Sequence, residues 1–137
     1  MITRFSTALE PDLLAAFDKF IACCGYKNRS EAIRDIIRKE ILEGYWKSGS
    51  GEVVGVISLV YRHRQHKLQC QLTELQHQDH ALVISATHVH LDHDNCLEVI
   101  LVRGAARRVK AMANRLISAR GVKRGTLSAM LAGAQLS

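Results

Sequence analysis

The chain has 137 residues, of which 47% are hydrophobic and 23% charged, a composition typical of a folded globular protein and not of a disordered one. Its longest apolar runs, such as residues 53–61, are about half the roughly 18 residues that a membrane helix needs. The first twelve residues lack the pattern of a signal peptide. The four cysteines lack the spacing of a secreted disulfide framework, so we expect a cytoplasmic protein with free thiols.

Charge and histidine are distributed unevenly along the chain. The net charge is +6; residues 1–48 carry eight basic and seven acidic side chains (+1), whereas residues 49–137 carry eleven and six (+5). All seven histidines lie between His63 and His93. The basic excess therefore lies mainly in the later part of the chain, and the clustered imidazoles are the most informative feature of the composition.

The first 48 residues predict a strand followed by two helices. Residues 2–9 are expected to form a strand with Arg4 and Ser6 on one face and Phe5 and Leu9 on the other. A helix-spaced apolar pattern then continues to Gly25, a C-terminal cap. Asn28 and Glu31 have the spacing of a capping box for a second helix, which we expect to end before Gly44. A unit this small, with one lone strand, cannot bury a sufficient core, so we expect it to pair with an identical chain.

Glycine and serine dominate from Gly44 to Glu52, which is typical of a linker, and a second domain is expected to begin near Val53. Its predicted strands are 53–61, 81–91, 96–103 and 122–131, and its predicted helices 64–77 and 105–119. This βαββαβ order is that of a ferredoxin-like domain. We therefore predict an α+β protein with two domains, residues 1–48 and 49–137.

The sharpest chemical signal is a His-x-His motif followed by a cysteine six residues after the second histidine. On a strand, His88 and His90 point to the same face with Cα atoms roughly 6–7 Å apart, so both imidazoles can reach one metal ion. A five-residue turn between the strands would place His90 opposite Cys96. His88 would then lie opposite Glu98, and the four side chains would share a face. A four-residue turn would move Cys96 to the other face.

Two imidazoles and a thiolate suit nickel(II), copper(II), zinc or cobalt. A fourth ligand is expected from His77 or His80, in the same chain or in a partner. The alternative is that these histidines are polar groups on a half-buried sheet, which the motif disfavours. The sequence has no H-E-x-x-H motif and no phosphate-binding glycine loop, so we expect no enzyme. We expect Cys23, Cys24 and Cys70 to pack in the core, and His63, His66 and His93 to lie at the surface or, at most, beside the metal ligands.

The N-terminal strand also predicts a DNA-binding surface. An antiparallel ribbon of two such strands would present Arg4 and Ser6 on one face and could enter the major groove. The first turn of the second helix, with Asn28, Arg29 and Ser30, offers backbone amides to a phosphate. The alternative is a helical hairpin that serves only in oligomerisation.

These motifs together resemble the nickel-responsive transcriptional regulators of the NikR family over nearly the whole chain. The most specific segments are residues 25–35, Gly-Tyr-Lys-Asn-Arg-Ser-Glu-Ala-Ile-Arg-Asp, and residues 88–98 around the His-x-His motif. The resemblance implies a ribbon-helix-helix DNA-binding domain, an ACT-like metal-binding domain, and a homotetramer built as a dimer of dimers. It also implies one Ni(II) per chain and a repressor of nickel uptake that binds a palindromic DNA operator when nickel is plentiful.

The resemblance further implies roles for individual residues. The implied nickel ligands are His88, His90 and Cys96 of one chain and His77 of another, with Tyr61 and Glu98 beside the site. A second, weaker cation site would involve Glu31 and Asp35. The base-reading positions of the ribbon would be Arg4, Ser6 and Ala8. Ala8 has no polar side chain that could form a hydrogen bond with a base, and contact with a thymine methyl group would take the place of that hydrogen bond.

A metal-trafficking or storage protein without DNA binding is the alternative function. The same ligands would serve it, and its N-terminal helices would only oligomerise. A DNA footprint that appears when nickel is added separates the two functions, and changing Arg4 to alanine should erase that footprint.

Overall fold

The computed structural model describes residues 1–133, so the last four residues of the predicted C-terminal domain lie outside the described part. The chain divides into two compact units, Met1–Arg38 and Lys39–Ser137. This division falls inside a helix and not at the predicted boundary after residue 48. Within residues 1–133, no helix is long and apolar enough to cross a membrane.

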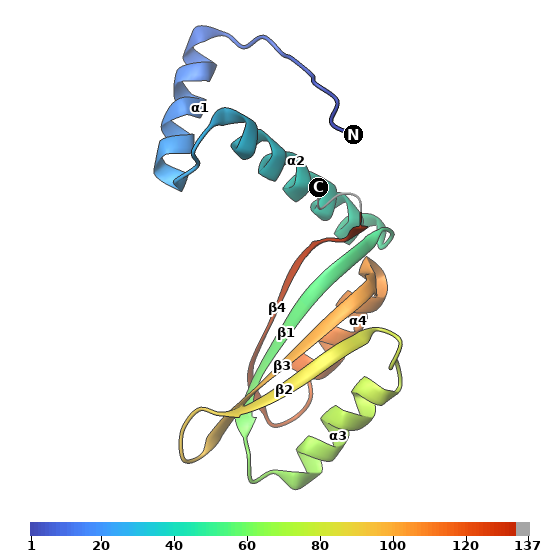
Figure 1. The fold of residues 1–137 in the computed structure, drawn as a ribbon. Helices are drawn as coiled ribbons and strands as arrows, with labels where there is room; N and C mark the ends of the chain where they lie inside the picture. The colour runs from blue at the N-terminus through green and yellow to red at the C-terminus, as the bar shows by residue number, and fades with distance from the viewer. Residues whose placement is uncertain (134–137) are drawn as a thin grey trace. The chain divides into compact units, whose positions relative to one another are not determined.

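The N-terminal unit contains helix α1 (Pro11–Cys24) and the first part of helix α2 (Arg29–Ser48), which Figure 1 shows in blue and teal. Helix α1 ends at Gly25, whose φ of 77° is a left-handed conformation that glycine adopts without strain. The side chain of Asn28 accepts a hydrogen bond of 2.9 Å from the N–H of Glu31 at the start of α2. The predicted end of α1 and start of α2 are therefore confirmed.

Residues 1–10 have no regular secondary structure, and their side chains are exposed. A strand needs a partner for its backbone groups, and no strand pairs with this segment among residues 1–133, so the ribbon of two chains stays a prediction. The unit buries Ile21 and Ala32. Its large exposed apolar side chains are Ile2, Phe5, Leu9, Leu13, Phe20, Ile36 and Ile37. Apolar surface of this extent is typical of a unit that is completed by another copy.

The C-terminal unit contains a four-stranded antiparallel sheet with the strand order β2-β3-β1-β4 and helices α3 and α4 on one face (Figure 1). Its elements are β1 (Glu52–Arg62), α3 (His66–His77), β2 (Val83–His90), β3 (Asn95–Ala105), α4 (Ala106–Ile117) and β4 (Val122–Leu131). The predicted βαββαβ order is confirmed, and this architecture is compatible with an ACT-like domain.

The core of this unit lies between the sheet and the two helices. Burial alternates along β1, where Ile57 and Leu59 are fully buried and the residues between the buried positions are half-exposed. Helix α4 adds the buried side chains of Val109 and Leu116. Within the described part of the C-terminal unit, no helix covers the opposite face of the sheet, and the exposed apolar side chains of that face include Val89, Leu101 and Met130.

The glycine-rich segment that was predicted to be a linker is ordered. Helix α2 continues through Gly44 to Ser48, so the predicted helix end is wrong. After the helix, the carbonyl oxygen of Gly49 accepts a hydrogen bond from the N–H of Arg107, and that of Gly51 accepts one from Ala106. The segment thereby satisfies two backbone N–H groups in the first turn of α4, which have no partner within their own helix.

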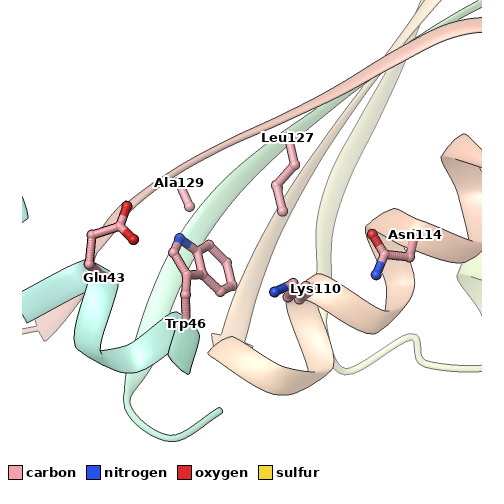
Figure 2. Close-up of a pocket in the computed structure, with 6 residues that line it drawn as sticks. All are labelled: Glu43, Trp46, Lys110, Asn114, Leu127 and Ala129. Carbon is pink, nitrogen blue, oxygen red and sulfur yellow. The ribbon is translucent and has the colours of Figure 1, made fainter. Parts of the chain in front are cut away.

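The end of α2 is held by an aromatic side chain of its last turn. Trp46 packs against the core of the C-terminal unit, and Figure 2 shows its indole between α2, α4 and β4. There it borders a shallow hollow of about 330 Å³, whose other lining residues are Glu43, Lys110, Asn114, Leu127 and Ala129. None of the residues that the sequence singled out for a metal or DNA lines this hollow, so the hollow is separate from the predicted metal ligands. The packing of Trp46 anchors the end of α2.

Candidate metal centre

The hairpin of β2 and β3 brings the predicted metal ligands onto one face. In its register His90 lies opposite Cys96, and His88 lies opposite Glu98. Residues directly opposite one another on antiparallel strands share a face of the sheet, so the five-residue turn and its register are confirmed. The side chains of His88 and His90 are exposed, whereas Cys96 is buried.

A network around Asp92 fixes this register. The carboxylate of Asp92 accepts hydrogen bonds from the backbone N–H groups of Asp94 and Asn95, and the side-chain amide of Asn95 donates to both of its oxygens. These bonds stabilise the ionised form, with the Asn95 side chain contributing most, and lower the pKa of Asp92 from 3.8 to about 2. The turn therefore depends on an ionised carboxylate.

We expect Asp92→Ala to lower the melting temperature of the C-terminal unit near neutral pH. Because the folded pKa of Asp92 is depressed, its contribution to stability is present above the unfolded pKa of 3.8 and is lost as the pH falls towards 2. The variant should therefore lose part of the acid sensitivity of unfolding in that window, measured by circular dichroism. Asp94→Ala is the control, since that carboxylate accepts none of these turn bonds; matching curves for the two variants would contradict this assignment.

A buried polar network lies behind the hairpin. The carboxylate of Glu98 accepts a hydrogen bond of 2.8 Å from the hydroxyl of Tyr61 and one of 2.9 Å from the amide of Gln76. Burial, followed by the neighbouring Glu98, raises the pKa of Tyr61, so its hydroxyl stays protonated at neutral pH and donates its hydrogen bond to Glu98. The ring of Tyr61 also makes an edge contact with His88. The structure thus brings Tyr61 and Glu98 next to a predicted ligand.

The thiol of Cys96 is held beside the same tyrosine. Its sulfur donates a hydrogen bond of 3.4 Å to the backbone carbonyl of Tyr61. Burial is the largest cause that raises the pKa of Cys96, so the free thiol holds its proton at neutral pH. A metal ion that binds here must displace this proton, and two imidazoles and one thiolate then form a donor set suited to a borderline-soft divalent ion.

The fourth predicted ligand belongs to helix α3 and not to the hairpin. His77 ends helix α3 and is exposed, directly after the buried Gln76, and His80 is exposed in the turn that follows. Among the described residues, no group of three or more histidine, cysteine, aspartate or glutamate side chains is arranged to hold a metal ion. The single chain therefore brings the hairpin donors onto one face of the sheet without closing a site around them.

Two side chains at the centre were not predicted from the sequence. Gln76 extends the buried series of Leu68 and Leu72 at four-residue spacing, and that periodicity was the signal that could have placed it. His63, which was expected at the surface or at most beside the ligands, is half-buried and stacks on His90 with ring centroids 5.0 Å apart.

The predicted DNA-contacting residues fall in the N-terminal unit. Arg4, Ser6 and Ala8 are exposed in the segment before α1, and Asn28 caps α2. The guanidinium of Arg29 makes two hydrogen bonds of 2.8 Å to the carboxylate of Asp18, and lowers the pKa of that carboxyl. The Arg29 side chain thus joins the two helices, and the amides of Arg29 and Ser30 are the groups that this turn offers to a phosphate.

The two residues of the predicted second cation site lie one turn apart on α2. Glu31 is half-exposed and Asp35 is exposed. Asp35 accepts a hydrogen bond of 3.1 Å from Arg38. They belong to no candidate metal-binding group in the described part of the chain, so this second site stays a prediction.

Comparison with known proteins identifies the family of this chain. Residues 54–130, more than half of the sequence, match the family described as the NikR C terminal nickel binding domain. The chain is 50% identical over 133 residues to a protein of Geotalea uraniireducens, covering 97% of this chain and 96% of that protein. It is 47% identical over 135 residues to a protein of Solibacter usitatus, covering 98% and 97%. Both relatives are named, provisionally, as nickel-responsive regulators. The chain belongs to the NikR family of nickel-responsive regulators.

Proposed function

We propose that this protein is a nickel-dependent transcriptional repressor that binds a palindromic operator when nickel is plentiful and thereby reduces nickel uptake. The observation that carries the proposal is the hairpin register, because it places two imidazoles and a buried thiol on one face. The names of the relatives support nickel as the ion. A thiol that must stay reduced and an operator as ligand both favour the cytoplasm.

In this proposal each chain binds one nickel ion, and the fourth ligand comes from another chain. His88, His90 and Cys96 supply three donors, and His77, exposed at the end of α3, supplies the fourth donor to a neighbouring copy. Tyr61, whose ring contacts His88, and Glu98, which lies opposite His88, would hold the ligands in position. A site shared by two chains links metal occupancy to their relative placement, which is how a metal can select one quaternary arrangement.

The exposed apolar surfaces favour a homotetramer. In the N-terminal unit, side chains such as Phe20 and Ile37 are uncovered in the single chain and would pack in a dimer of ribbon-helix-helix units. In the C-terminal unit, the sheet face that carries Val89, Leu101 and Met130 would pack against another copy. Two kinds of interface on one chain are what a dimer of dimers requires.

The N-terminal ribbon would read DNA in the major groove. Two copies of the segment before α1 would pair as antiparallel strands, with Arg4, Ser6 and Ala8 facing the bases. The amides of Arg29 and Ser30 at the start of α2 would bind a backbone phosphate. A second, weaker cation would bind near Glu31 and Asp35 in the DNA-bound form.

DNA selection tests this function. Random duplexes are selected with the nickel-loaded protein, and the enriched sequence is used in a gel-retention assay with nickel or with a chelator. We expect retention with nickel alone, and loss of about 1–3 kcal/mol of binding free energy per disrupted base contact in Arg4→Ala. Lys19→Ala, which removes one positive charge from α1, is the control. A metal-trafficking or storage protein would enrich no sequence, and equal retention without nickel would also contradict the proposal.

A further inference from the structure

The ring of His63 lies against the exposed ligand histidine at the end of β2. The His63 and His90 rings are stacked with centroids 5.0 Å apart and planes inclined by 22°. His88, the other histidine of the motif, lies 5.9 Å from His90 between ring centroids, with planes tilted by 48°. His90 thus has one ring packed nearly flat against its face.

The backbone of His63 is fixed from two directions. Its N–H donates a hydrogen bond of 3.1 Å to the carbonyl of Asp94, in the turn between β2 and β3. Its carbonyl accepts a hydrogen bond of 2.7 Å from the side-chain amide of Gln69 on α3. The stacked ring is therefore attached both to the hairpin that carries the ligands and to the helix that ends at His77.

His90 needs such support because of its place in the sheet. It is the last residue of β2, an edge strand of the sheet, and its side chain is exposed. An exposed imidazole rotates broadly about its terminal torsion, and that freedom is lost when the nitrogen binds a metal ion. A ring packed against its face restricts the torsion before the metal arrives.

The geometry distinguishes this role from that of a further ligand. An imidazole binds a metal ion with a nitrogen lone pair that lies in the plane of its ring. Because the two planes are nearly parallel and the rings are stacked, the lone pairs of His63 and His90 lie in separate planes and do not converge on one ion. The Nδ1 atom of His63 is buried without a hydrogen-bond partner among the described residues, so no hydrogen bond from that atom accounts for the ring's position.

We propose that His63 is a positioning residue that acts through the face of its ring to orient His90 for metal binding. This inference rests on the proposed nickel site. It predicts that the nitrogen atoms of His63 are dispensable and that its planar ring is not.

Three variants test the proposal: His63→Ala removes the ring, His63→Phe keeps a planar ring without nitrogen, and His66→Ala removes an exposed histidine three residues away, at the start of α3. Nickel affinity is measured by competition with a chelator, and site geometry by the absorption spectrum of the nickel-loaded protein. Removing a residue that orients a metal ligand typically lowers metal affinity by about 10- to 100-fold. We expect His63→Ala to lower nickel affinity by this factor and to alter the absorption spectrum. His63→Phe and His66→Ala should retain affinity and spectrum close to the wild type.

Metal-free nuclear magnetic resonance provides a second readout. In the metal-free protein, the ring protons of His90 should shift in His63→Ala and stay close to their wild-type positions in His63→Phe, because a stacked ring shifts its neighbour. Two results would overturn the proposal: His90 resonances that do not respond to His63→Ala, or a His63→Phe variant that binds nickel as weakly as His63→Ala. Absence of nickel binding in the wild-type protein would instead refute the proposed function, while the His90 resonances would still report whether the stack exists.

Discussion

Replacing His77 by alanine is expected to lower nickel affinity by more than the roughly 10- to 100-fold that follows loss of an outer-shell partner, and to abolish nickel-dependent retention of DNA. His77 is exposed at the end of α3, and no candidate metal-binding group lies within the described part of one chain. Without this donor the ion would keep three ligands from one hairpin and lose its connection to the second chain. Chelator competition and gel retention measure the two effects.

His80→Ala is the matched control for this prediction. His80 is also exposed and lies three residues further along, so its removal changes the same surface and the same residue type. We expect it to retain nickel affinity and DNA binding. If His80→Ala loses both and His77→Ala loses neither, the fourth ligand has been assigned to the wrong histidine.

Replacing Gly51 by alanine is expected to lower the free energy of unfolding of the C-terminal unit by about 2 kcal/mol. Gly51 has a φ of 85°, and a Cβ atom there would lie 2.3 Å from the ring of Tyr45. The ring would have to leave the core surface on which it packs, and the Gly51 carbonyl that caps α4 would move with it. Trp46, the only tryptophan of the chain, reports unfolding of this unit in urea by fluorescence.

Gly44→Ala is the control for the glycine prediction. Gly44 lies inside α2, and a Cβ atom there would meet no atom within 4 Å. Alanine should therefore raise stability by about 0.5–1 kcal/mol, because a helix interior favours it over glycine. If both substitutions change stability equally, the segment after α2 behaves as the linker that its composition predicts, and the cap on α4 is not required.

The C-terminal unit was predictable because its signals are local. The predicted ranges lie close to the observed strands and helices, and the turn length set the register that brings His90 opposite Cys96. A one-residue slip in that hairpin would have moved Cys96 to the other face, so the motif's spacing was a strong constraint on the site.

The end of α2 was not predictable from composition. Glycine and serine after Gly44 are typical of a linker, whereas the packing of Trp46 on α4 and β4 depends on contacts between elements far apart in the sequence. The same limit applies to the cysteines. Cys23, Cys24 and Cys70 are exposed in the single chain, so the expectation that they pack in its core is wrong.

The stacking partner of His90 was missed for a related reason. His63 follows β1, and it reaches His90 only because β1 and β2 both flank β3 in the folded sheet. For the N-terminal strand, the sequence pattern is clear, but its expected partner is a second chain, and residues 1–10 of the single chain have no regular secondary structure. Local patterns thus predicted the elements of the C-terminal unit, and contacts across its sheet decided the remainder.

The central claim is that one nickel ion joins two chains, and complementation between two inactive variants tests it most directly. His77→Ala keeps the hairpin donors and lacks the donated histidine, whereas Cys96→Ala keeps His77 and lacks the thiolate. The two variants are unfolded together, refolded as mixed oligomers and loaded with nickel. We predict that neither variant alone shows the absorption spectrum of the complete four-ligand nickel site and that the mixture regains part of it. A mixture as silent as its two components would show that all four ligands must come from one chain and would contradict the proposed mechanism.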